Sequence, residues 1–257
     1  MITIVLNGQD YLEQTIQSVV CQSYDNVEYI VIDGGSKDGT LDVLHKYDHM
    51  IDYWVSEPDS GIGDAFNKGV TVSTGEWINF MNCGDTFTSP DVVHYVAGSA
   101  DETVDIVFGK ANLVDTKGTI LLTTGAVFDQ KKFYRGRMLP HQSVFHNRRY
   151  FEQYGLFDNS LRTVMCYEML LRKRPLQSVF IDRPLSNMLV GGVHESCDYL
   201  RLRETRMVKR EYCAEAGALR IEMDYWHAMV RALIKRALNR VGLKSITTKV
   251  RQLENRH

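Results

Sequence analysis

The chain has 257 residues, of which 44% are hydrophobic and 24% charged, and its formal net charge is −2. This composition excludes a disordered chain, and the charge gives no reason to expect nucleic acid as a partner. The five cysteines are odd in number and form no Cys-x-x-Cys pair, so a reduced, cytoplasmic setting is expected. The first residues lack the features of a signal peptide, and no apolar run is long enough to predict a transmembrane helix.

The first hundred residues alternate short apolar runs with helical patterns. Residues 2–6 are apolar and rich in β-branched side chains, which predicts a buried parallel strand. Leu12, Ile16, Val19 and Val20 then follow at helical spacing. Further strands are expected at 28–32, 51–57 and 76–81, and further helices at 39–47, 61–73 and 89–100. This alternation predicts a parallel sheet with helices on both faces.

The rest of the chain is less regular. Residues 104–115 and 118–125 predict a pair of strands joined at Lys117 and Gly118, and helices are expected at 148–158 and 166–174. From Trp226 to the end the chain carries eight Lys or Arg and the single acid Glu254. This change of composition predicts a boundary.

An acid follows the second expected strand in "VIDGGSKDGT". Ligands of open parallel sheets bind at the carboxyl ends of the strands, so Asp33 is placed to accept hydrogen bonds from a nucleoside, and Gly34 leaves room for it. Alternatively, Asp33 caps the turn and Asp38 begins the next helix. The stretch is neither a Gly-x-Gly-x-x-Gly fingerprint nor a P-loop.

Two more strands end in acidic turns. In "SEPDSGIGDAFNKGV", Asp64 and Lys68 form either an i,i+4 surface pair or, with the helix N-terminus, a place for phosphate. In "FMNCGDTF", Asn82 and Asp85 offer oxygens suited to Mg²⁺ or Mn²⁺, and the alternative there is an Asx-turn before a helix.

Together these three motifs, in this order and spacing, closely resemble the GT-A domain of family 2 glycosyltransferases of bacterial exopolysaccharide and O-antigen synthesis, over about residues 1–195. The resemblance implies an α/β fold with a Rossmann-like, mostly parallel sheet flanked by helices. It implies a nucleotide-sugar-binding half at 1–98 and an acceptor-side α+β half at 99–225, and the change of composition predicts a basic helical tail at 226–257.

The resemblance also assigns roles. Asp33 would contact the nucleoside, usually uridine, and Asp85 would be the last acid of a degenerate DXD motif that holds Mg²⁺ or Mn²⁺ on the diphosphate. His194, in a Gly-rich segment, would reach phosphate or metal, or else face solvent. The residues expected around the donor are Asp33, Gly34, Glu57, Asp59, Asp64, Lys68, Asn82 and Gly84.

The acceptor half departs from the family pattern at one position. His141 falls where relatives place an active-site wall residue, and the alternative is a structural histidine. Cys166 stands where relatives carry the presumed catalytic base, an aspartate, and a thiol with a pKa near ~8.5 is a poor base. Glu168 is about 200° further round a helix, so it replaces that base only if the local backbone allows. The expected catalytic residues are Asp85, Glu168 and His141.

The basic tail carries an apolar stripe. A helix with such a stripe and flanking Lys or Arg suits an anionic membrane surface, and the alternative is a helix packed on the domain or on a partner. A cytoplasmic enzyme, peripheral on the inner membrane face, is the expectation. The stripe consists of Met229, Leu233, Leu238, Val241 and Leu243.

The function expected from these features is inverting transfer of a hexosyl or N-acetylhexosaminyl group from a UDP-sugar to a saccharide or lipid-linked saccharide acceptor in surface polysaccharide synthesis. The alternative is a nucleotide-sugar-binding protein with little turnover, because of Cys166. A nucleotidyltransferase is disfavoured, since "LNGQDYLE" lacks the basic residues of its loop.

Overall fold

The computed structural model describes residues 1–101, 103–191, 198–213 and 217–240. The chain forms two compact units, Met1–Val190 and Gly191–His257. Each is described by itself below. The expected boundary at residue 226 lies inside the last helix, and the division of the chain into donor half, acceptor half and tail stays a prediction.

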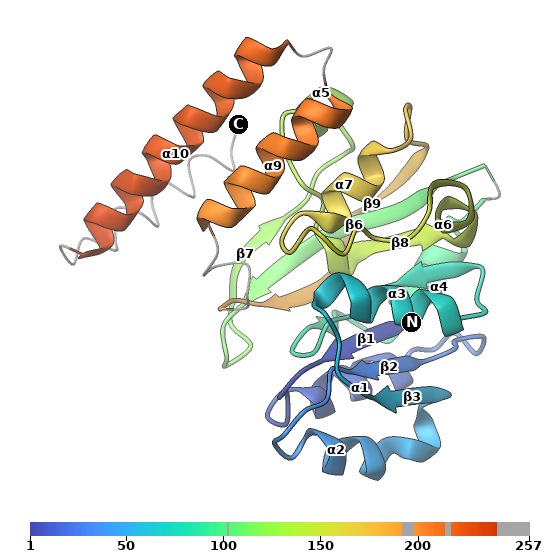
Figure 1. Cartoon of the computed structure of the whole chain (residues 1–257). Helices are drawn as coiled ribbons and strands as arrows, with labels where there is room; N and C mark the ends of the chain where they lie inside the picture. Colours follow the sequence, from blue (N-terminus) through green and yellow to red (C-terminus); the bar gives the residue numbers. More distant parts are fainter. Residues whose placement is uncertain (102, 192–197, 214–216, 241–257) are drawn as a thin grey trace. The chain divides into compact units, whose positions relative to one another are not determined.

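A three-stranded parallel sheet begins the first unit, in the order β1-β2-β3 (Figure 1). Its strands are β1 (Ile2–Val5), β2 (Ile30–Asp33) and β3 (Tyr53–Ser56). The expected strands are confirmed here, because apolar β-branched runs suit a strand covered on both faces. The helices between and after them are α1 (Leu12–Val20), α2 (Thr40–Tyr47), the 3-10 helix η1 (Asp48–Met50) and α3 (Ile62–Val72).

A second, six-stranded sheet follows, with the order β4-β8-β6-β9-β5 and with β7 paired to β6. Only β6 and β9 run parallel among its pairs, so this sheet is mixed. The expected pair of strands at 104–125 is confirmed as β6 and β7. The strands are β4 (Trp77–Asn79), β5 (Thr86–Phe87), β6 (Ile106–Val114), β7 (Ile120–Thr124), β8 (Val144–Asn147) and β9 (Ser178–Leu189).

The strand at 76–81 corrects one expectation. It was predicted as a fourth parallel strand, but β4 pairs antiparallel with β8. Only the segment after β4 runs parallel to β1, through a bridge between Phe80 and Ile2. The remaining helices of this unit are α4 (Val92–Ala97), α5 (Gln130–Tyr134), η2 (His141–Ser143), α6 (Arg148–Tyr154) and α7 (Met165–Leu171).

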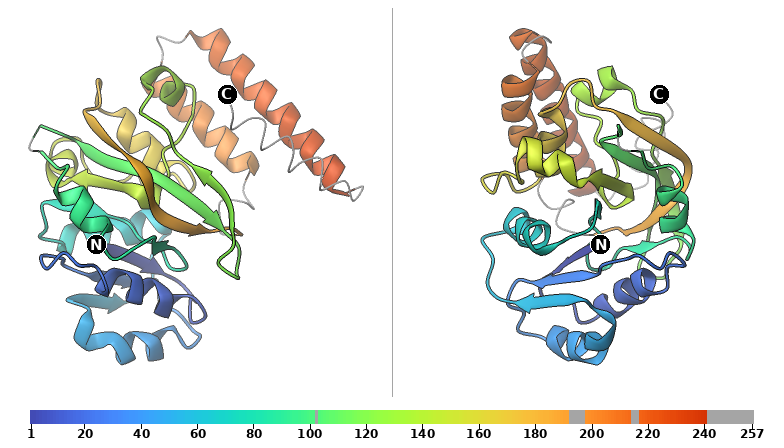
Figure 2. Two further views of the ribbon diagram at one scale, coloured as in Figure 1. Left: turned by 180° about the vertical axis from the view of Figure 1, so that it is seen from behind. Right: turned by 90° about the vertical axis from the view of Figure 1, so that its right-hand side faces the viewer.

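Helices cover both faces of the parallel sheet. Right-handed crossovers place α1 and α2 on one face, and the return from β3 to the segment beside β1 places α3 on the other. Figure 2 shows α1 and α3 on opposite sides of these strands. Leu12, Ile16, Val31 and Leu44 are fully buried in the resulting core.

The second unit is a helical hairpin of α9 (Asp198–Tyr212) and α10 (Ala218–Arg240). Arg206 and Arg210 of α9 both pair with Glu222 of α10, at 2.6 and 2.5 Å. Of the apolar stripe expected in the tail, Leu233 is exposed and Met229 is half-buried, whereas Val241 and Leu243 lie outside the described residues. Within the described parts of the chain, no helix is long and apolar enough to cross a membrane.

Candidate active site

The fold has a switch point beside β1, where the helices change from one face of the sheet to the other. On one side β1 pairs with β2, and on the other it meets the segment after β4: the amides of Met81 and Cys83 donate to the carbonyls of Ile2 and Ile4, at 2.9 and 3.3 Å. Ligands of open α/β sheets bind at the carboxyl edge beside such a point. The turns that follow β1, β2, β3 and β4 therefore enclose the candidate site.

The turn after β2 is held together by hydrogen bonds to Asp33, the acid that begins it. Asp33 is fully buried, and its Oδ2 accepts hydrogen bonds from the amides of Gly35 and Ser36, at 3.2 and 3.0 Å, and from the hydroxyl of Ser56, at 2.5 Å. Its Oδ1 accepts from the hydroxyl of Ser36 at 2.5 Å. This geometry favours the turn-capping alternative, and the nucleoside contact of Asp33 stays a prediction.

The turn after β1 is fastened to the turn after β2. The Asn7 amide donates to the Ser36 hydroxyl at 2.7 Å, and the Asn7 side chain accepts from the Lys37 amide at 2.9 Å. Asp38 accepts from the amide of Thr40 at 3.0 Å, so it supports the start of α2 as the alternative proposed. These contacts fix two of the turns as one rigid edge.

The turn after β3 carries a cluster of charges. Lys68 lies 2.8 Å from Glu57 and 3.7 Å from Asp64, and the hydrogen bond that it donates to Glu57 raises the pKa of Lys68 above its ordinary value. Lys68 therefore forms the i,i+4 pair and a second ion pair. Asp59 accepts from the Gly61 amide at 2.9 Å, and a Cβ at Gly34 would collide with the Asp59 carboxylate. Gly34 is thus needed so that Asp59 can lie over the β2 turn.

The turn after β4 holds Asp85 in a buried corner, where its side chain is 6% exposed. Its Oδ2 accepts from the Gln142 side chain at 2.6 Å, and its Oδ1 accepts from the Leu189 amide at 2.8 Å. The Thr15 hydroxyl accepts from the Gly84 amide and donates to the Asp85 carbonyl, both at 2.9 Å. Burial raises the pKa of Asp85 to about 7, against the opposing effect of its two donors.

Unbonded oxygens surround this corner. Asn82 Oδ1 and Gln142 Oε1 are both buried without a hydrogen-bond partner. The Asx-turn alternative needs a bond from a backbone amide to Asn82 Oδ1, so it is wrong for this turn. A carboxylate beside amide oxygens is the donor set that hard divalent cations prefer.

A metal would nevertheless have few protein ligands. No group of three His, Cys, Asp or Glu suited to a metal is found within residues 1–101, 103–191, 198–213 and 217–240. His194, the second expected metal ligand, lies outside these ranges. Any metal at Asp85 would therefore take most of its oxygens from the substrate and from water.

His141 and Cys166 meet on the acceptor side. His141 Nε2 lies 3.7 Å from the Cys166 sulfur, and the imidazole stacks on Phe80 with ring centroids 5.3 Å apart. Gln142, the next residue, is the donor that binds Asp85. Burial raises the pKa of the Cys166 thiol to about 12, so the thiol stays protonated at neutral pH. Cys166 therefore cannot serve as a base, but its sulfur contacts the imidazole of the residue that precedes Gln142.

The Glu168 carboxylate is already engaged by an arginine. It is 3% exposed, and both carboxylate oxygens bind the Arg172 guanidinium, at 2.8 and 2.6 Å. Arg172 also donates to the carbonyls of Tyr154 and Leu156, at 2.8 and 2.7 Å. This pair fastens α7 to the end of α6, which favours a structural role. The general-base role of Glu168 stays a prediction.

Several residues that build the site were not predicted. Ser36 and Ser56 close the β2 turn, and the Leu189 amide is supplied by β9. Thr15 could have been predicted from the sequence, because the helical pattern places it on the buried face of α1 among Leu12, Ile16 and Val19. A hydroxyl on such a face needs a partner, and here the partner is the Asp85 turn.

Comparison with known proteins identifies the relatives of this chain. The profile of the family described as "Glycosyl transferase family 2" matches residues 1–180. An uncharacterized glycosyltransferase of Mycobacterium tuberculosis is 33% identical over 178 residues, 67% of this chain and 67% of that protein. A PGL/p-HBAD biosynthesis glycosyltransferase of Mycobacterium bovis is 27% identical over 174 residues, 65% of this chain and 66% of that protein.

Two solved structures share the fold. TarS 1–349 of S. aureus in complex with UDP-GlcNAc has a TM-score of 0.66 and 16% identity, over 93% of this chain and 72% of that chain. The mannosyltransferase PcManGT of Pyrobaculum calidifontis, in complex with GDP-Man and Mn²⁺, has a TM-score of 0.65 and 16% identity, over 94% and 78% of the two chains. The expected GT-A fold is thereby confirmed.

Proposed function

Because this chain belongs to glycosyl transferase family 2, we propose that it is an inverting enzyme that moves a sugar from a nucleotide diphosphate to a hydroxyl of its acceptor. The observation that carries this proposal is the corner at Asp85. It joins a buried carboxylate and unbonded amide oxygens at the switch point of the sheet, and Gln142, which binds that carboxylate, follows His141 in the chain. Sugar transfer requires the donor phosphates on one side of the reacting sugar and the acceptor hydroxyl on the other. Such a corner offers polar groups that could bind both.

The donor we favour is a UDP-sugar with a hexosyl or N-acetylhexosaminyl group. TarS was solved with UDP-GlcNAc and PcManGT with GDP-Man, so structures with this fold accept different bases. Uridine is favoured here by the family resemblance at Asp33. For recognition, that carboxylate would have to exchange the serine bonds that it now accepts for bonds from the ligand.

The residues around Asp85 fit a divalent cation, Mg²⁺ or Mn²⁺. Asp85 and Asn82 would hold it, and when bound it would supply positive charge to the departing diphosphate. Asp85 must be ionised for this role. Since burial raises its pKa to about 7, donor binding is expected to weaken as the pH falls below neutrality.

For the acceptor hydroxyl we propose His141 as the general base. Nε2 would exchange its contact with the Cys166 sulfur for the acceptor hydroxyl and take the proton, while the stacked Phe80 ring would hold the imidazole in place. Inverting transfer needs such a base at the attacking hydroxyl, and a positioned base contributes ~10²–10⁴ in rate. Cys166 has the wrong protonation state, and Glu168 is engaged by Arg172.

The test is a transfer assay preceded by a donor search. A thermal-shift panel of UDP-, GDP- and dTDP-sugars with and without Mn²⁺ identifies the donor, because a ligand bound only to the folded state stabilises it. Transfer to saccharide acceptors is then compared for wild type, His141→Gln and Cys166→Ala. We expect His141→Gln to lose about 10²-fold or more in rate with unchanged donor affinity, and Cys166→Ala to retain most activity.

Other outcomes distinguish the alternatives. A wild-type chain that binds the donor but releases no nucleotide with any acceptor would support a nucleotide-sugar-binding protein without turnover. Equal rates for wild type and His141→Gln would reject His141 as the base. A gain from Cys166→Asp would show that a carboxylate at that position is what the chain lacks.

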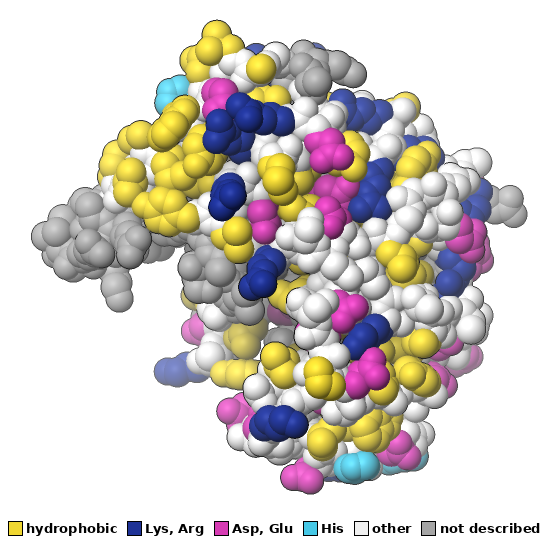
Figure 3. Space-filling model, in the orientation of Figure 1, with side chains coloured by type: hydrophobic (Ala, Val, Ile, Leu, Met, Phe, Trp, Pro, Cys, Tyr) yellow, Lys and Arg dark blue, Asp and Glu magenta, His cyan; other side chains and the backbone are white. Residues whose placement is uncertain are grey.

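We further propose that α10 binds an anionic membrane surface, which would suit a lipid-linked acceptor of surface polysaccharide synthesis. Hydrophobic side chains gather over this helix (Figure 3), and the basic Arg220 and Arg231 are exposed with them. A basic amphipathic helix of this kind favours anionic lipid. The exposed apolar residues, spaced three and four apart, are Leu219, Met223, Trp226, Val230, Leu233 and Ile234.

Sedimentation with liposomes tests this second proposal. The full chain should sediment with vesicles that contain phosphatidylserine and much less with phosphatidylcholine alone. Replacing Leu233 and Ile234 with Glu should reduce sedimentation, since both side chains are about half exposed and their loss costs the fold little. Equal sedimentation of both forms, or none by wild type, would reject a membrane role for α10.

A further inference from the structure

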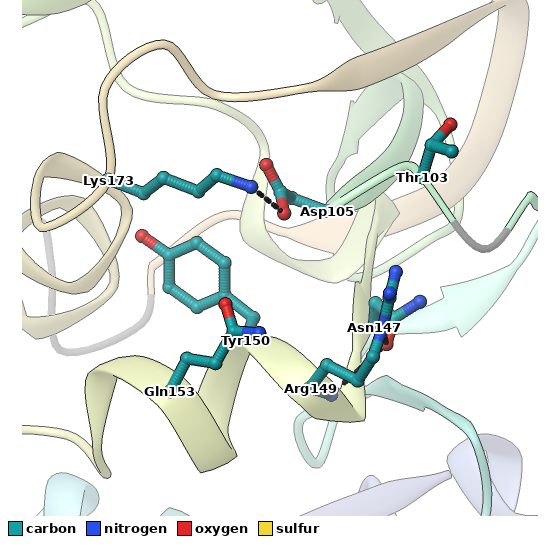
Figure 4. Close-up of a pocket in the computed structure, with 7 residues that line it drawn as sticks. All are labelled: Thr103, Asp105, Asn147, Arg149, Tyr150, Gln153 and Lys173. Atoms are coloured by element: carbon teal, nitrogen blue, oxygen red, sulfur yellow. Dashed lines mark hydrogen bonds and ion pairs between the residues drawn. The ribbon is translucent and has the colours of Figure 1, made fainter.

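A second polar cavity lies in the first unit, away from the candidate active site (Figure 4). Its volume is about 90 Å³, and it lies between the end of β8, the first turns of α6 and the segments that carry Asp105 and Lys173. Asn147, Arg149, Tyr150 and Gln153 complete most of its wall. No role in transfer has been assigned to these side chains.

The sheet register separates this cavity from the Asp85 corner. Trp77 pairs with Asn147 and Asn79 pairs with Phe145 in the antiparallel β4–β8 ladder. Asn147 therefore lies at the amino end of β4, whereas Asn82 and Asp85 follow its carboxyl end. The two sites occupy opposite ends of the same pair of strands.

Asn147 contributes an unbonded donor to the cavity. Its side chain is 2% exposed, and its Oδ1 accepts from the amide and the Nε of Arg149, at 3.0 and 3.3 Å. These donors identify which amide atom is the oxygen, so the remaining atom is the Nδ2 donor. Nδ2 is buried without a hydrogen-bond partner. A buried donor without a hydrogen bond destabilises the folded state, so a ligand with a hydrogen-bond acceptor is expected in the cavity.

The charges around the cavity favour a negatively charged acceptor. Asp105 is already bound by Lys173 at 2.7 Å and by the Gln177 amide at 2.8 Å, so its charge is compensated. Arg149 is exposed, adds one positive charge beyond that pair and interacts electrostatically with the exposed Asp101. A cation would meet the positive charge of Arg149, whereas an anion would meet that charge and the Asn147 donor.

We propose that this cavity binds an oxyanion of the phosphate class, either as free phosphate or as a phosphate monoester. One water takes about 30 Å³ in the liquid, so a cavity of about 90 Å³ has room for more than a single bridging water. Phosphate presents only acceptors to Asn147 Nδ2 and matches the planar donors of Arg149. The cavity is a site separate from the one that would hold the donor diphosphate.

The test follows the site itself by NMR of the full chain. Inorganic phosphate and glycerol 3-phosphate are titrated separately at constant ionic strength, while the Asn147 side-chain NH₂ and the Arg149 Nε resonances are monitored. Three variants are compared with wild type. Arg149→Gln removes the exposed charge, Asn147→Asp keeps the oxygen that caps α6 but replaces the donor, and Lys117→Gln removes an exposed charge elsewhere.

We expect saturable shifts of both resonances in wild type and in Lys117→Gln. Affinity should fall about tenfold or more in Arg149→Gln, because a charge-assisted hydrogen bond is lost, and binding should vanish in Asn147→Asp. Shifts with phosphate alone identify the free ion, and shifts with both probes identify a monoester. The proposal is overturned if neither probe moves these resonances, or if both variants bind as tightly as wild type.

Discussion

Asp33 ends one of the two segments that flank β1 and Asp85 follows the other, yet their surroundings differ. Asp33 accepts hydrogen bonds from two backbone amides and two serine hydroxyls, all within its own turn or the adjoining strand. Asp85 is equally hidden from solvent but accepts only one bond to each oxygen, from residues distant in sequence. Burial raises the pKa of Asp85 to about 7.

The difference separates a structural acid from one prepared for a ligand. A carboxylate with many donors is stabilised in the ionised form without a ligand. A buried carboxylate with few donors, beside the unbonded oxygens of Asn82 and Gln142, gains from a positive ion or a proton. The short sequence pattern, an acid in a polar turn after an apolar run, is the same in both places.

Glu168, like Asp33, binds groups of its own fold. Its substitution should have the largest effect on the free energy of unfolding. Glu168→Gln leaves the Arg172 guanidinium, which is 15% exposed, without its carboxylate, and breaking a buried pair costs about 3–5 kcal/mol. Urea unfolding of wild type and variant measures this loss. If stability is unchanged while sugar transfer collapses, Glu168 is a catalytic base after all.

Asp33→Ala should be the next most damaging change. It leaves two amides and two hydroxyls of the β2 turn without their acceptor, at a fully buried position. We expect a loss of about 3 kcal/mol in the free energy of unfolding. Asp33→Asn, which keeps one acceptor oxygen, serves as the milder control. A variant as stable as wild type that binds UDP weakly would instead place Asp33 in the nucleoside site.

Asp85 should make the stability of the folded chain depend on pH. Its folded-state pKa is raised to about 7 from 3.8, so between these values the folded chain keeps a proton that the unfolded chain has lost. Stability therefore falls as the pH rises through this window, by about 1 kcal/mol per pH unit relative to Asp85→Asn. Parallel stability profiles for the two proteins from pH 4 to 8 would contradict the assigned environment.

A substitution in the turn after β3 should have the smallest effect on the free energy of unfolding. Glu57 pairs with Lys68 at 2.8 Å, but its side chain is 52% exposed. Exposed pairs contribute little, so Glu57→Gln should change the free energy of unfolding by less than about 1 kcal/mol. A larger loss, measured in the same urea series, would mean that this third acidic turn is as structural as the β2 turn.

Local sequence predicted the parallel strands and their helices, because β-branched runs and helical spacing are properties of neighbouring residues. It could not predict that β4 runs antiparallel to β8, since that partner is distant in the chain. β9 was missed because Asp182, Arg183 and Pro184 interrupt its apolar pattern. The acids of the site were identified from their turns, but which of them bind their own turn depends on side chains such as Ser56 and Gln142, which arrive from other elements.

The most direct test of this account is calorimetric titration of UDP and the matched UDP-sugar into wild type and Asp85→Asn, with Mn²⁺ and with EDTA, at pH 8. Asp85 is then mostly ionised, and the variant keeps the shape of the side chain. Wild type is expected to bind tightly only with Mn²⁺, and Asp85→Asn is expected to bind weakly and equally in both conditions while remaining folded. Donor binding by wild type that is indifferent to EDTA, or an Asp85→Asn variant with full Mn²⁺-dependent affinity, would contradict it.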